Sequence, residues 1–235
     1  MAEPGPLLGR GRDADVYDLG PGRVLRRYRD PGASAEREAA VMVHARAHGL
    51  PVPEVFDVDG PDLVMARVEG PTMLAAVLRR PWTITRQATV LAELHRAVHA
   101  VPAPDLLDRR TGPGDALLHL DLHPENVLLT PSGPVIIDWT NAARGTAEVD
   151  VADAWLVMSA ARVPGPAVVA AAVRAAQGVF PRQFRRAAGL DLAAALPTAA
   201  ARRLADRNLG EQERRRIRRL AGLPLSARPG SPEPS

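Results

Sequence analysis

The feature that most restricts the fold of this chain is a polar segment followed by two short apolar runs. Asp121 and Asn126 lie directly before the run Val127–Leu129. A Pro-Ser-Gly-Pro turn separates that run from Val135–Ile137, and Asp138 comes next. This order predicts a β-hairpin, in which the end of the second strand returns beside the start of the first. The side chains of Asn126 and Asp138 are therefore expected to face one point.

These three polar residues have the chemistry of a metal-assisted transfer site. An amide oxygen and a carboxylate at one point offer the hard oxygen ligands that suit Mg²⁺. Asp121 lies one short loop earlier and can reach the same point without binding metal. The spacing His-x-Asp-x-x-x-x-Asn, from His119 to Asn126, is that of a kinase catalytic loop, whose acid accepts or orients the proton of the attacking hydroxyl. A polar turn capped by Asp121 is the less favoured interpretation, because Asp138 follows at hairpin spacing.

A second pattern lies near the N-terminus. Gly9, Gly11, Ala14 and Val16 occupy the positions of a glycine-rich loop, G-x-G-x-x-G-x-V, with Ala14 in place of the third glycine. Gly9 and Gly11 let backbone N–H groups approach phosphates closely, and Val16 would cover the base. A Gly-x-Gly alone is more often a plain turn. Its position ahead of the polar segment favours a phosphate-binding loop.

The next expected part is a cation that grips the phosphates, and here the chain offers arginine rather than lysine. Alternation along the strand puts Arg26 on the face expected to meet the nucleotide, with Arg27 as the alternative. Both could instead be solvated strand residues. On the helix predicted over residues 34–48, Glu38 is preferred over Glu36 as the partner of the cation, because it begins the apolar-periodic part. A helix N-terminal acid stabilised by the macrodipole is the alternative for Glu38.

The chain divides into two parts of different patterning. Residues 1–69 contain strand patterns and one helix, whereas residues 70–225 are mainly helical. The tail, residues 226–235, is rich in Pro, Ser and Gly and is expected to be disordered. We therefore expect an α+β fold with a small lobe of antiparallel sheet plus helix and a larger, mainly helical lobe. A ligand is expected in the cleft between them.

Taken in this order, the motifs resemble those of the aminoglycoside phosphotransferase family, a branch of the protein-kinase-like fold. The match extends over residues 8–155 and is strongest around the polar segment and its hairpin. The resemblance implies ATP and Mg²⁺ as cofactors, Asp121 as the catalytic base, and Asn126 and Asp138 as the metal ligands. It also implies that Glu38 pairs with the strand cation.

The resemblance implies further roles outside the catalytic loop. Met65, Ala66 and Val68 would belong to a hinge whose backbone meets the adenine base. Asp150 would brace the catalytic loop. His95 and His99 lie four residues apart but lack the H-E-x-x-H order of a zinc site, so a polar or capping role is expected for them.

The implied activity is transfer of a phosphoryl group from ATP to a hydroxyl of a small molecule. Because arginine replaces lysine at the nucleotide grip, a catalytically weak, nucleotide-binding pseudokinase is the alternative. The C-terminal part usually builds the acceptor site in this family. Here residues 174–219 are rich in Arg and poor in acids, which favours a neutral or anionic acceptor over a polycationic antibiotic.

Composition bears on partners and location. All 30 of the Lys and Arg residues are Arg, but they are interspersed with 27 acids, so the excess is weak support for nucleic-acid binding. The arginines of residues 214–219 are expected on a solvated helix face. The chain has no Cys, no apolar stretch in residues 1–11 and no run long enough to cross a bilayer. A cytoplasmic protein without membrane or nucleic-acid partners is expected, with a monomer favoured.

Overall fold

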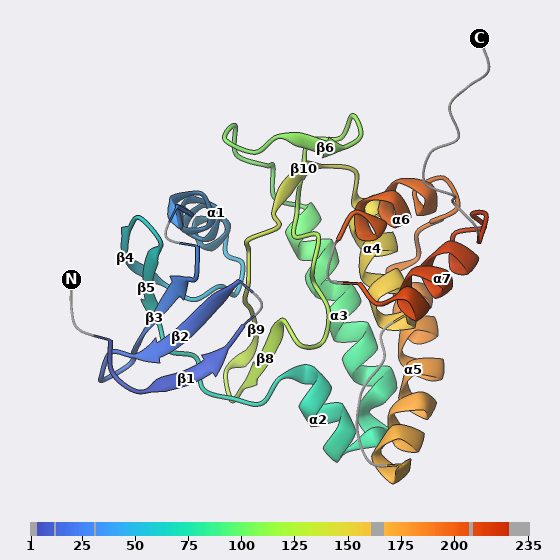
Figure 1. The fold of residues 1–235 in the computed structure, drawn as a ribbon, viewed down its shortest axis with the longest axis horizontal. Helices are drawn as coiled ribbons and strands as arrows, with labels where there is room; N and C mark the ends of the chain where they lie inside the picture. Colours follow the sequence, from blue (N-terminus) through green and yellow to red (C-terminus); the bar gives the residue numbers. More distant parts are fainter. Residues whose placement is uncertain (1–3, 12, 31, 161–166, 207–208, 226–235) are drawn as a thin grey trace.

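A computed structural model describes residues 4–11, 13–30, 32–160, 167–206 and 209–225, so the predicted disordered tail lies outside the described residues. Figure 1 shows two parts, a small sheet-and-helix lobe that includes the N-terminal strands and a larger lobe dominated by helices. Residues 67–72 connect the two. The division lies where the sequence patterning changes.

Five antiparallel strands form the sheet of the small lobe, in the order β1-β2-β3-β5-β4. Gly20 and Gly22 have positive φ angles of 94° and 71° and make the turn between the second and third strands, as the Gly-Pro-Gly sequence indicates. Patterning did not reveal β1, because all four of its residues are exposed and no apolar alternation marks it. The strands are β1 (Leu7–Arg10), β2 (Ala14–Asp18), β3 (Arg23–Tyr28), β4 (Val55–Asp59) and β5 (Asp62–Ala66).

Helix α1 (Glu36–Ala47) carries a buried acid of the small lobe, Glu38. It buries Val41 and Met42 on its apolar face, and Glu38 points into the protein beside them, with 4% of its surface exposed. The helix begins two residues after the start of the predicted range. Ser34 is outside it, where its hydroxyl accepts the amide hydrogen of Glu36 at 3.2 Å.

The large lobe is a helical assembly around one apolar core. Helix α3 packs along α5, and α4 packs against α5, α6 and α7. Leu91, Leu156 and Phe184 are among its fully buried side chains, each contributing about 1.5–3 kcal/mol by burial. The helices are α2 (Met73–Arg79), the 3₁₀ helix η1 (Pro81–Thr83), α3 (Ile84–His99), α4 (Ala147–Ala160), α5 (Ala167–Ala188), α6 (Leu196–Leu204) and α7 (Glu211–Leu220).

Two small sheets hold the predicted catalytic loop between the lobes. We call this loop, residues 119–126, the catalytic segment. The predicted hairpin is present as β8 (Val127–Thr130) and β9 (Gly133–Ile136). A three-stranded sheet, which the sequence did not reveal, has the order β6-β10-β7. Its strands are three residues long, too short for alternation to be visible, and are β6 (Arg109–Thr111), β7 (Ala116–Leu118) and β10 (Ala143–Gly145). Because β7 ends at the residue before His119, this sheet fixes where the catalytic segment starts.

The connection between the lobes is attached to the hairpin. The amide of Leu129 donates to the carbonyl of Pro71 at 2.9 Å. Gly70 passes so close to that strand that a Cβ atom there would lie 2.2 Å from the Leu129 carbonyl oxygen. Glycine is therefore required at this position, and the hairpin is held against the end of the small lobe.

Candidate active site

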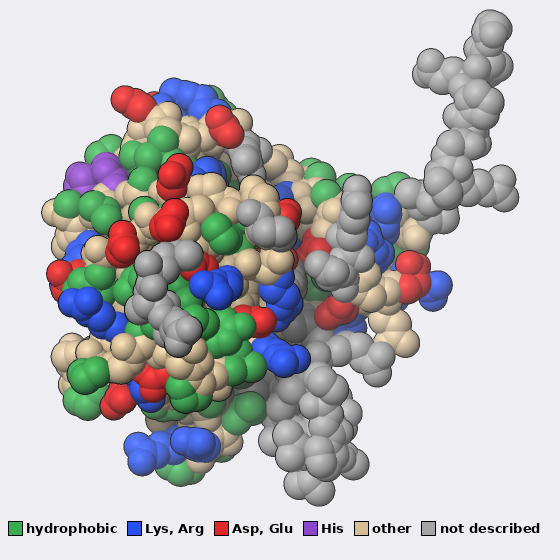
Figure 2. All heavy atoms as spheres, turned by 60° about the vertical axis from the view of Figure 1, so that its left-hand side comes forward, with side chains coloured by type: hydrophobic (Ala, Val, Ile, Leu, Met, Phe, Trp, Pro, Cys, Tyr) green, Lys and Arg blue, Asp and Glu red, His purple; other side chains and the backbone are tan. Residues whose placement is uncertain are grey.

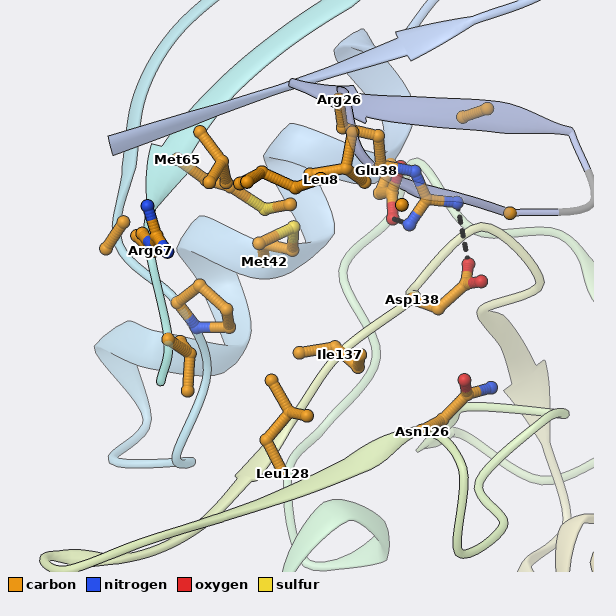
Figure 3. Close-up of a pocket in the computed structure, with 18 of the residues that line it drawn as sticks. Leu8, Arg26, Glu38, Met42, Met65, Arg67, Asn126, Leu128, Ile137 and Asp138 are labelled. Atoms are coloured by element: carbon orange, nitrogen blue, oxygen red, sulfur yellow. Dashed lines mark hydrogen bonds and ion pairs between the residues drawn. The ribbon is translucent and has the colours of Figure 1, made fainter. Parts of the chain in front are cut away.

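A cavity of about 700 Å³ lies between the sheet of the small lobe and the β8–β9 hairpin (Figure 3). Every residue predicted to contact nucleotide or metal lines it. These are Gly9, Gly11, Val16, Arg26, Glu38, Met65, Ala66, Val68, Asn126 and Asp138. Asp121 is not among the lining residues. Residues from both lobes thus surround one cavity, with the catalytic segment at its edge.

One part of the cavity has apolar side chains on both sides, and residues of the connection between the lobes also line the cavity. Met42 and Met65 from the small lobe and Leu128 and Ile137 from the hairpin region line it (Figure 3). Strand pairing and turns use most of the backbone groups nearby: the amide of Ala66 donates to Glu54 O and that of Arg67 to Gly22 O, both at 2.8 Å.

Val68 differs from Ala66 and Arg67, which precede it along the chain. No residue in the described part of the chain accepts its amide hydrogen. Of the predicted hinge residues, Val68 therefore has the amide best placed to meet a polar edge of a planar base.

Arg26 is the central cation of the cavity. Its Nη1 donates to Glu38 Oε1 at 3.0 Å, and its Nη2 donates to Asp138 Oδ1 at 2.9 Å. Nη2 also donates to the Thr140 hydroxyl at 2.9 Å. The two carboxylates raise the pKa of Arg26 although burial alone would lower it. Arg27 points away from the cavity and binds Asp62 through two hydrogen bonds of 2.6 Å.

Glu38 anchors this arrangement from α1. Besides Arg26, it accepts the hydroxyl of Tyr28 at 2.6 Å and the amide of Trp139 at 3.1 Å. Burial raises the pKa of Glu38, and the charge of Arg26 opposes that rise. Glu36 is exposed, so the structure separates the two predicted alternatives clearly. Sequence reasoning missed Tyr28 and Thr140, which lie two residues beyond Arg26 and Asp138.

Asp138 has an unusual backbone. Its φ angle is +65°, a left-handed conformation that Asp adopts more readily than most residues. Burial would raise the pKa of Asp138, but the charge and hydrogen bond of Arg26 outweigh burial and lower it. The carboxylate is therefore ionised at neutral pH and available to a cation.

Asn126 and Asp138 fit the donor set of a magnesium site. The amide nitrogen of Asn126 donates to the backbone oxygen of Asp121 at 2.9 Å, which fixes the orientation of the side chain. Its amide oxygen then points toward the Asp138 carboxylate (Figure 3). One amide oxygen and one ionised carboxylate match the few protein ligands that Mg²⁺ takes when phosphates supply the rest.

Asp121 lies at the end of a strained turn. Leu120 before it has φ +57°, which costs about 1–2 kcal/mol for a residue with a Cβ. The carboxylate of Asp121 accepts from Arg203 Nη2 at 2.7 Å and from Asn126 Nδ2 at 3.3 Å. His123 Nε2 lies 3.6 Å from Oδ1. Sequence reasoning missed Arg203, which comes from α6.

His119 connects the catalytic segment to the strand that leads to Asp138. Its Nε2 lies 3.1 Å from the carbonyl of Ile137, and its ring packs on Trp139. Burial lowers the pKa of His119, so the ring is neutral and donates its Nε2 hydrogen. His119 thus orders the loop by hydrogen bonding.

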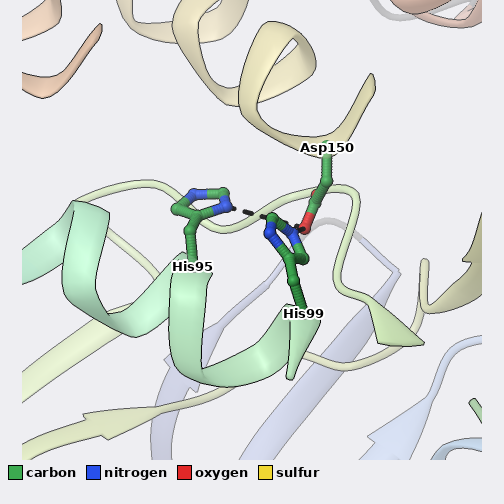
Figure 4. Close-up of side chains that lie close together, drawn as sticks. All are labelled: His95, His99 and Asp150. Atoms are coloured by element: carbon green, nitrogen blue, oxygen red, sulfur yellow. Dashed lines mark hydrogen bonds and ion pairs between the residues drawn. The ribbon is translucent and has the colours of Figure 1, made fainter. Parts of the chain in front are cut away.

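Asp150 is fully buried behind the catalytic segment (Figure 4). Its carboxylate accepts the amides of Leu120 at 2.7 Å and His119 at 3.2 Å, the contacts expected of a residue that braces this loop. His95 and His99 of α3 both point toward it. Burial would raise the pKa of Asp150, but its interactions with His95 and His99 outweigh burial and lower the pKa well below its usual value.

The same three side chains have the composition of a metal site. However, His99 Nε2 and Asp150 Oδ2 are 2.8 Å apart, a hydrogen-bond distance. Two ligands of a tetrahedral zinc ion with bonds of about 2.0 Å lie about 3.3 Å apart. The spacing is therefore that of a hydrogen-bonded brace.

The surface gives little support for a nucleic-acid face. In Figure 2, arginine and acidic side chains are interspersed over the visible face. On α7, Arg215 is exposed and pairs with Glu211. Arg214 does not lie on a solvated face as predicted, because its Nη1 donates to the Leu204 carbonyl at the end of α6 at 2.6 Å. Among the described residues, no helix is long and apolar enough to cross a membrane.

Comparison with known sequences gives one family. The sequence model described as "Phosphotransferase enzyme family" matches residues 5–115 and 113–190. A search of curated proteins finds no significant match. Residues beyond 190, including α6 and α7, lie outside the family match.

Solved structures of small-molecule kinases share the fold. A choline/ethanolamine kinase family protein from Mesorhizobium loti aligns with a TM-score of 0.57 and 18% identity, covering 95% of this chain and 83% of that one. The aminoglycoside phosphotransferase APH(4)-Ia, in complex with AMP-PNP and hygromycin B, gives 0.58 and 17%, covering 85% and 84%. An amicoumacin kinase with AMP-PNP, Ca²⁺ and Ami gives 0.55 and 14%, covering 94% and 88%. At such identities the likeness concerns the fold, and it confirms the predicted two-lobed α+β architecture.

Proposed function

The chain belongs to the phosphotransferase enzyme family, and from this premise we propose that it transfers the γ-phosphoryl group of ATP to a hydroxyl group of a small molecule. The observation that carries the proposal is that Arg26, Glu38, Asn126 and Asp138 line one cavity with the Asp121 loop at its edge. Phosphoryl transfer depends almost entirely on positioning and on charge stabilisation. The cavity supplies both.

On the nucleotide side, the adenine base lies against Met42, Met65 and Leu128, with the Val68 amide at its polar edge. These residues support the assignment because they make an apolar slot beside an unused backbone donor. Arg26 contacts the phosphates. Its guanidinium already holds Glu38 and Asp138, so the nucleotide shares an oriented cation and does not have to order a flexible one.

On the transfer side, Asn126 and Asp138 would hold magnesium, which would neutralise charge on the phosphates. Asp121 accepts the proton of the attacking hydroxyl. Each carboxylate oxygen has two lone pairs, so Oδ2, which has only the long contact to Asn126, keeps acceptor capacity. Its side chain is 18% exposed, which leaves one edge open to an acceptor.

The acceptor is proposed to be neutral or anionic. Arg202 of α6 donates to the Leu120 carbonyl directly before Asp121, and 25% of its side chain is exposed. Its charge therefore lies near the edge of Asp121 that an acceptor would approach. Of the proteins with the same fold, one is a choline/ethanolamine kinase family protein, one is an amicoumacin kinase, and one is in complex with hygromycin B. Amino alcohols and antibiotics therefore belong in the test panel.

One observation favours the second candidate, a nucleotide-binding pseudokinase. Both functional acids are already paired with arginine, Asp138 with Arg26 and Asp121 with Arg203. If these pairs do not open or share their charge, nucleotide binds without turnover.

The test is a phosphorylation assay with purified protein, ATP and Mg²⁺. The acceptor panel contains amino alcohols, sugars, anionic hydroxy compounds and aminoglycosides, and product is detected as ADP and as acceptor mass. We expect Mg²⁺-dependent transfer that EDTA abolishes, with aminoglycosides among the poorer acceptors. AMP-PNP binding with silence across the whole panel would favour the pseudokinase, and absence of both binding and transfer would refute the proposal.

A further inference from the structure

The side chain of Arg203 links the catalytic segment to a buried acid of the large lobe. Its Nε donates to Asp153 Oδ2 at 2.8 Å, and its Nη2 pairs with the same oxygen. Nη2 also donates to Asp121 Oδ1 at 2.7 Å and to the Leu120 carbonyl at 3.1 Å. One guanidinium therefore contacts both the side chain of Asp121 and the backbone just before it.

The other end of this link is fixed by burial. Asp153 on α4 has no exposed surface, and the side chain of Arg203 is 8% exposed. Asp153 also accepts from Arg202 Nη1 at 3.2 Å. The charges of Asp153 and Asp121 raise the pKa of Arg203 against the effect of burial. A charged guanidinium with this little exposure has few other places to go, because an unpaired buried charge is costly.

Two groups donate hydrogen bonds to the Asp121 carboxylate. Arg203 holds Oδ1, and the Asn126 amide lies near Oδ2. The backbone of Leu120 is held in the same way, with its amide on Asp150 and its carbonyl on Arg203. Leu120 has a left-handed φ angle, so its conformation persists only because neighbouring groups enforce it.

We infer that Arg203 is a positioning residue for phosphoryl transfer: anchored on Asp153, it sets the orientation of the Asp121 carboxylate. The inference rests on the proposed function of Asp121 as the base. Arg203 acts through Asp121 and does not itself line the cavity. It lies beyond residue 190, outside the part of the chain that the family model matches.

The test variant is the pair Arg203→Met with Asp153→Asn. Replacing Arg203 alone would leave buried Asp153 undercompensated and could unfold the protein, whereas changing both partners removes the charges together. Arg202, which donates to Asp153 Oδ1, can still donate to the amide oxygen in the Asp153→Asn protein. We expect kcat to fall about 100-fold, the effect of a small misplacement of a catalytic group, with the affinity for AMP-PNP unchanged. Arg203→Lys keeps the charge without the fork and should lie between the variant and wild type.

The matched control is Arg27→Met with Asp62→Asn in the small lobe. That pair is also an arginine bound to a buried aspartate, with hydrogen bonds of 2.6 Å, and it faces away from the nucleotide cavity. Arg27 is more exposed than Arg203, 35% against 8%, so we expect a smaller change in melting temperature and an unchanged kcat. If the Arg203/Asp153 variant kept the kcat of the control, the positioning role would be wrong.

A structural readout separates this inference from the proposed function. Crystals of wild type and the Arg203/Asp153 variant with AMP-PNP and Mg²⁺ should show the Asp121 carboxylate rotated away from its wild-type orientation only in the variant. An unmoved carboxylate overturns the inference whether or not an acceptor is found. A wild-type protein that transfers nothing contradicts the proposed function, and the orientation of the carboxylate still decides the role of Arg203.

Discussion

Two arginine bridges reach the candidate active site, one from each lobe, and they differ in the other groups that they can contact. Arg26 joins buried Glu38 to Asp138, and Arg203 joins buried Asp153 to Asp121. In both, one carboxylate is an anchor from a helix and the other belongs to the proposed machinery. Only Arg26 lines the cavity.

This difference indicates two uses of the same ion-pair chemistry. Arg26 can exchange part of its contact with Asp138 for the phosphates of a ligand in the cavity. Arg203 is enclosed by α4, α6 and the catalytic segment, so its contacts are expected to stay constant through the reaction. The Arg26 bridge is expected to bind the nucleotide, whereas the Arg203 bridge is expected to orient Asp121. The substitutions below test this difference.

The largest effect is expected for Asp121→Asn. The amide keeps the shape but cannot take the proton of the acceptor hydroxyl, so kcat should fall by about 10²–10⁴-fold. Nucleotide affinity, measured by thermal shift with AMP-PNP and Mg²⁺, should be unchanged because Asp121 lies outside the cavity lining. Turnover is measured with the best acceptor of the panel.

Glu125→Gln is the control for this variant, because Glu125 is an exposed acid in the same loop. It should behave like wild type in both assays. Normal turnover by Asp121→Asn would show that Asp121 is not the base. Loss of nucleotide affinity in this variant would contradict the separate roles of the two bridges.

The next effect is expected for Arg26→Met, and it should appear in binding. A charge-assisted contact contributes about 1.5–3 kcal/mol, so the affinity for AMP-PNP should fall on the order of 10–100-fold. Arg27→Met should leave this affinity unchanged, since Arg27 binds Asp62 away from the cavity. Arg26→Lys should retain binding, as a point charge in place of a fork. Equal losses for Arg26→Met and Arg27→Met would refute the assignment.

The Arg26 experiment needs a folded protein. Removing Arg26 leaves Glu38 buried with 3% of its side chain exposed, and breaking a buried ion pair costs about 3–5 kcal/mol. The variant Arg26→Met with Glu38→Gln removes both charges and should recover most of the melting temperature without recovering nucleotide affinity. Recovery of both would mean that Arg26 acts through stability alone.

The two bridges also differ in how far the sequence reveals them. The proximity of Asn126 and Asp138 was predictable because a hairpin brings the end of its second strand back beside the start of its first. The orientation of Arg26 was predictable because side chains alternate between the two faces of a strand. Arg203 lies 82 residues from Asp121 on a helix whose packing no local pattern specifies. The three-residue strands β6, β7 and β10 were invisible for a related reason: their pairing, and not their composition, makes them strands.

A smaller effect, on the free energy of unfolding, is expected when the pH changes. It depends on His119, which lies between the two bridges. His119 extends from the segment before Asp121 to the carbonyl before Asp138. Burial lowers the pKa of His119, so below about pH 6.5 the unfolded chain takes up a proton that the folded protein does not. The free energy of unfolding should therefore fall as pH drops through this range, by at most about 1.4 kcal/mol per pH unit.

His119→Gln is the variant that checks this slope, because its amide can still donate to the Ile137 carbonyl. Urea unfolding of both proteins is measured between pH 5 and 8. The variant should lose the decline that begins near pH 6.5. Asp150, whose pKa is lowered, acts in a separate window: its stabilisation is present above the usual Asp value of about 3.8 and is lost only at lower pH. If His119→Gln left the slope of unfolding free energy against pH unchanged, a group other than His119 would cause the pH dependence.

The smallest effect is expected for a solvent-exposed pair of an arginine and an acid. Arg215 and Glu211 on α7 are 66% and 69% exposed, so water and salt screen the pair and both side chains lose entropy to form it. Arg215→Ala should change the free energy of unfolding by about 0.3–0.5 kcal/mol at most, with no change in kcat. Urea unfolding and the transfer assay measure the two quantities. Because the residue type and partner chemistry match those of the two bridges, a large loss here would show that arginine–acid pairing as such, and not burial and placement, sets the effects predicted for Arg26 and Arg203.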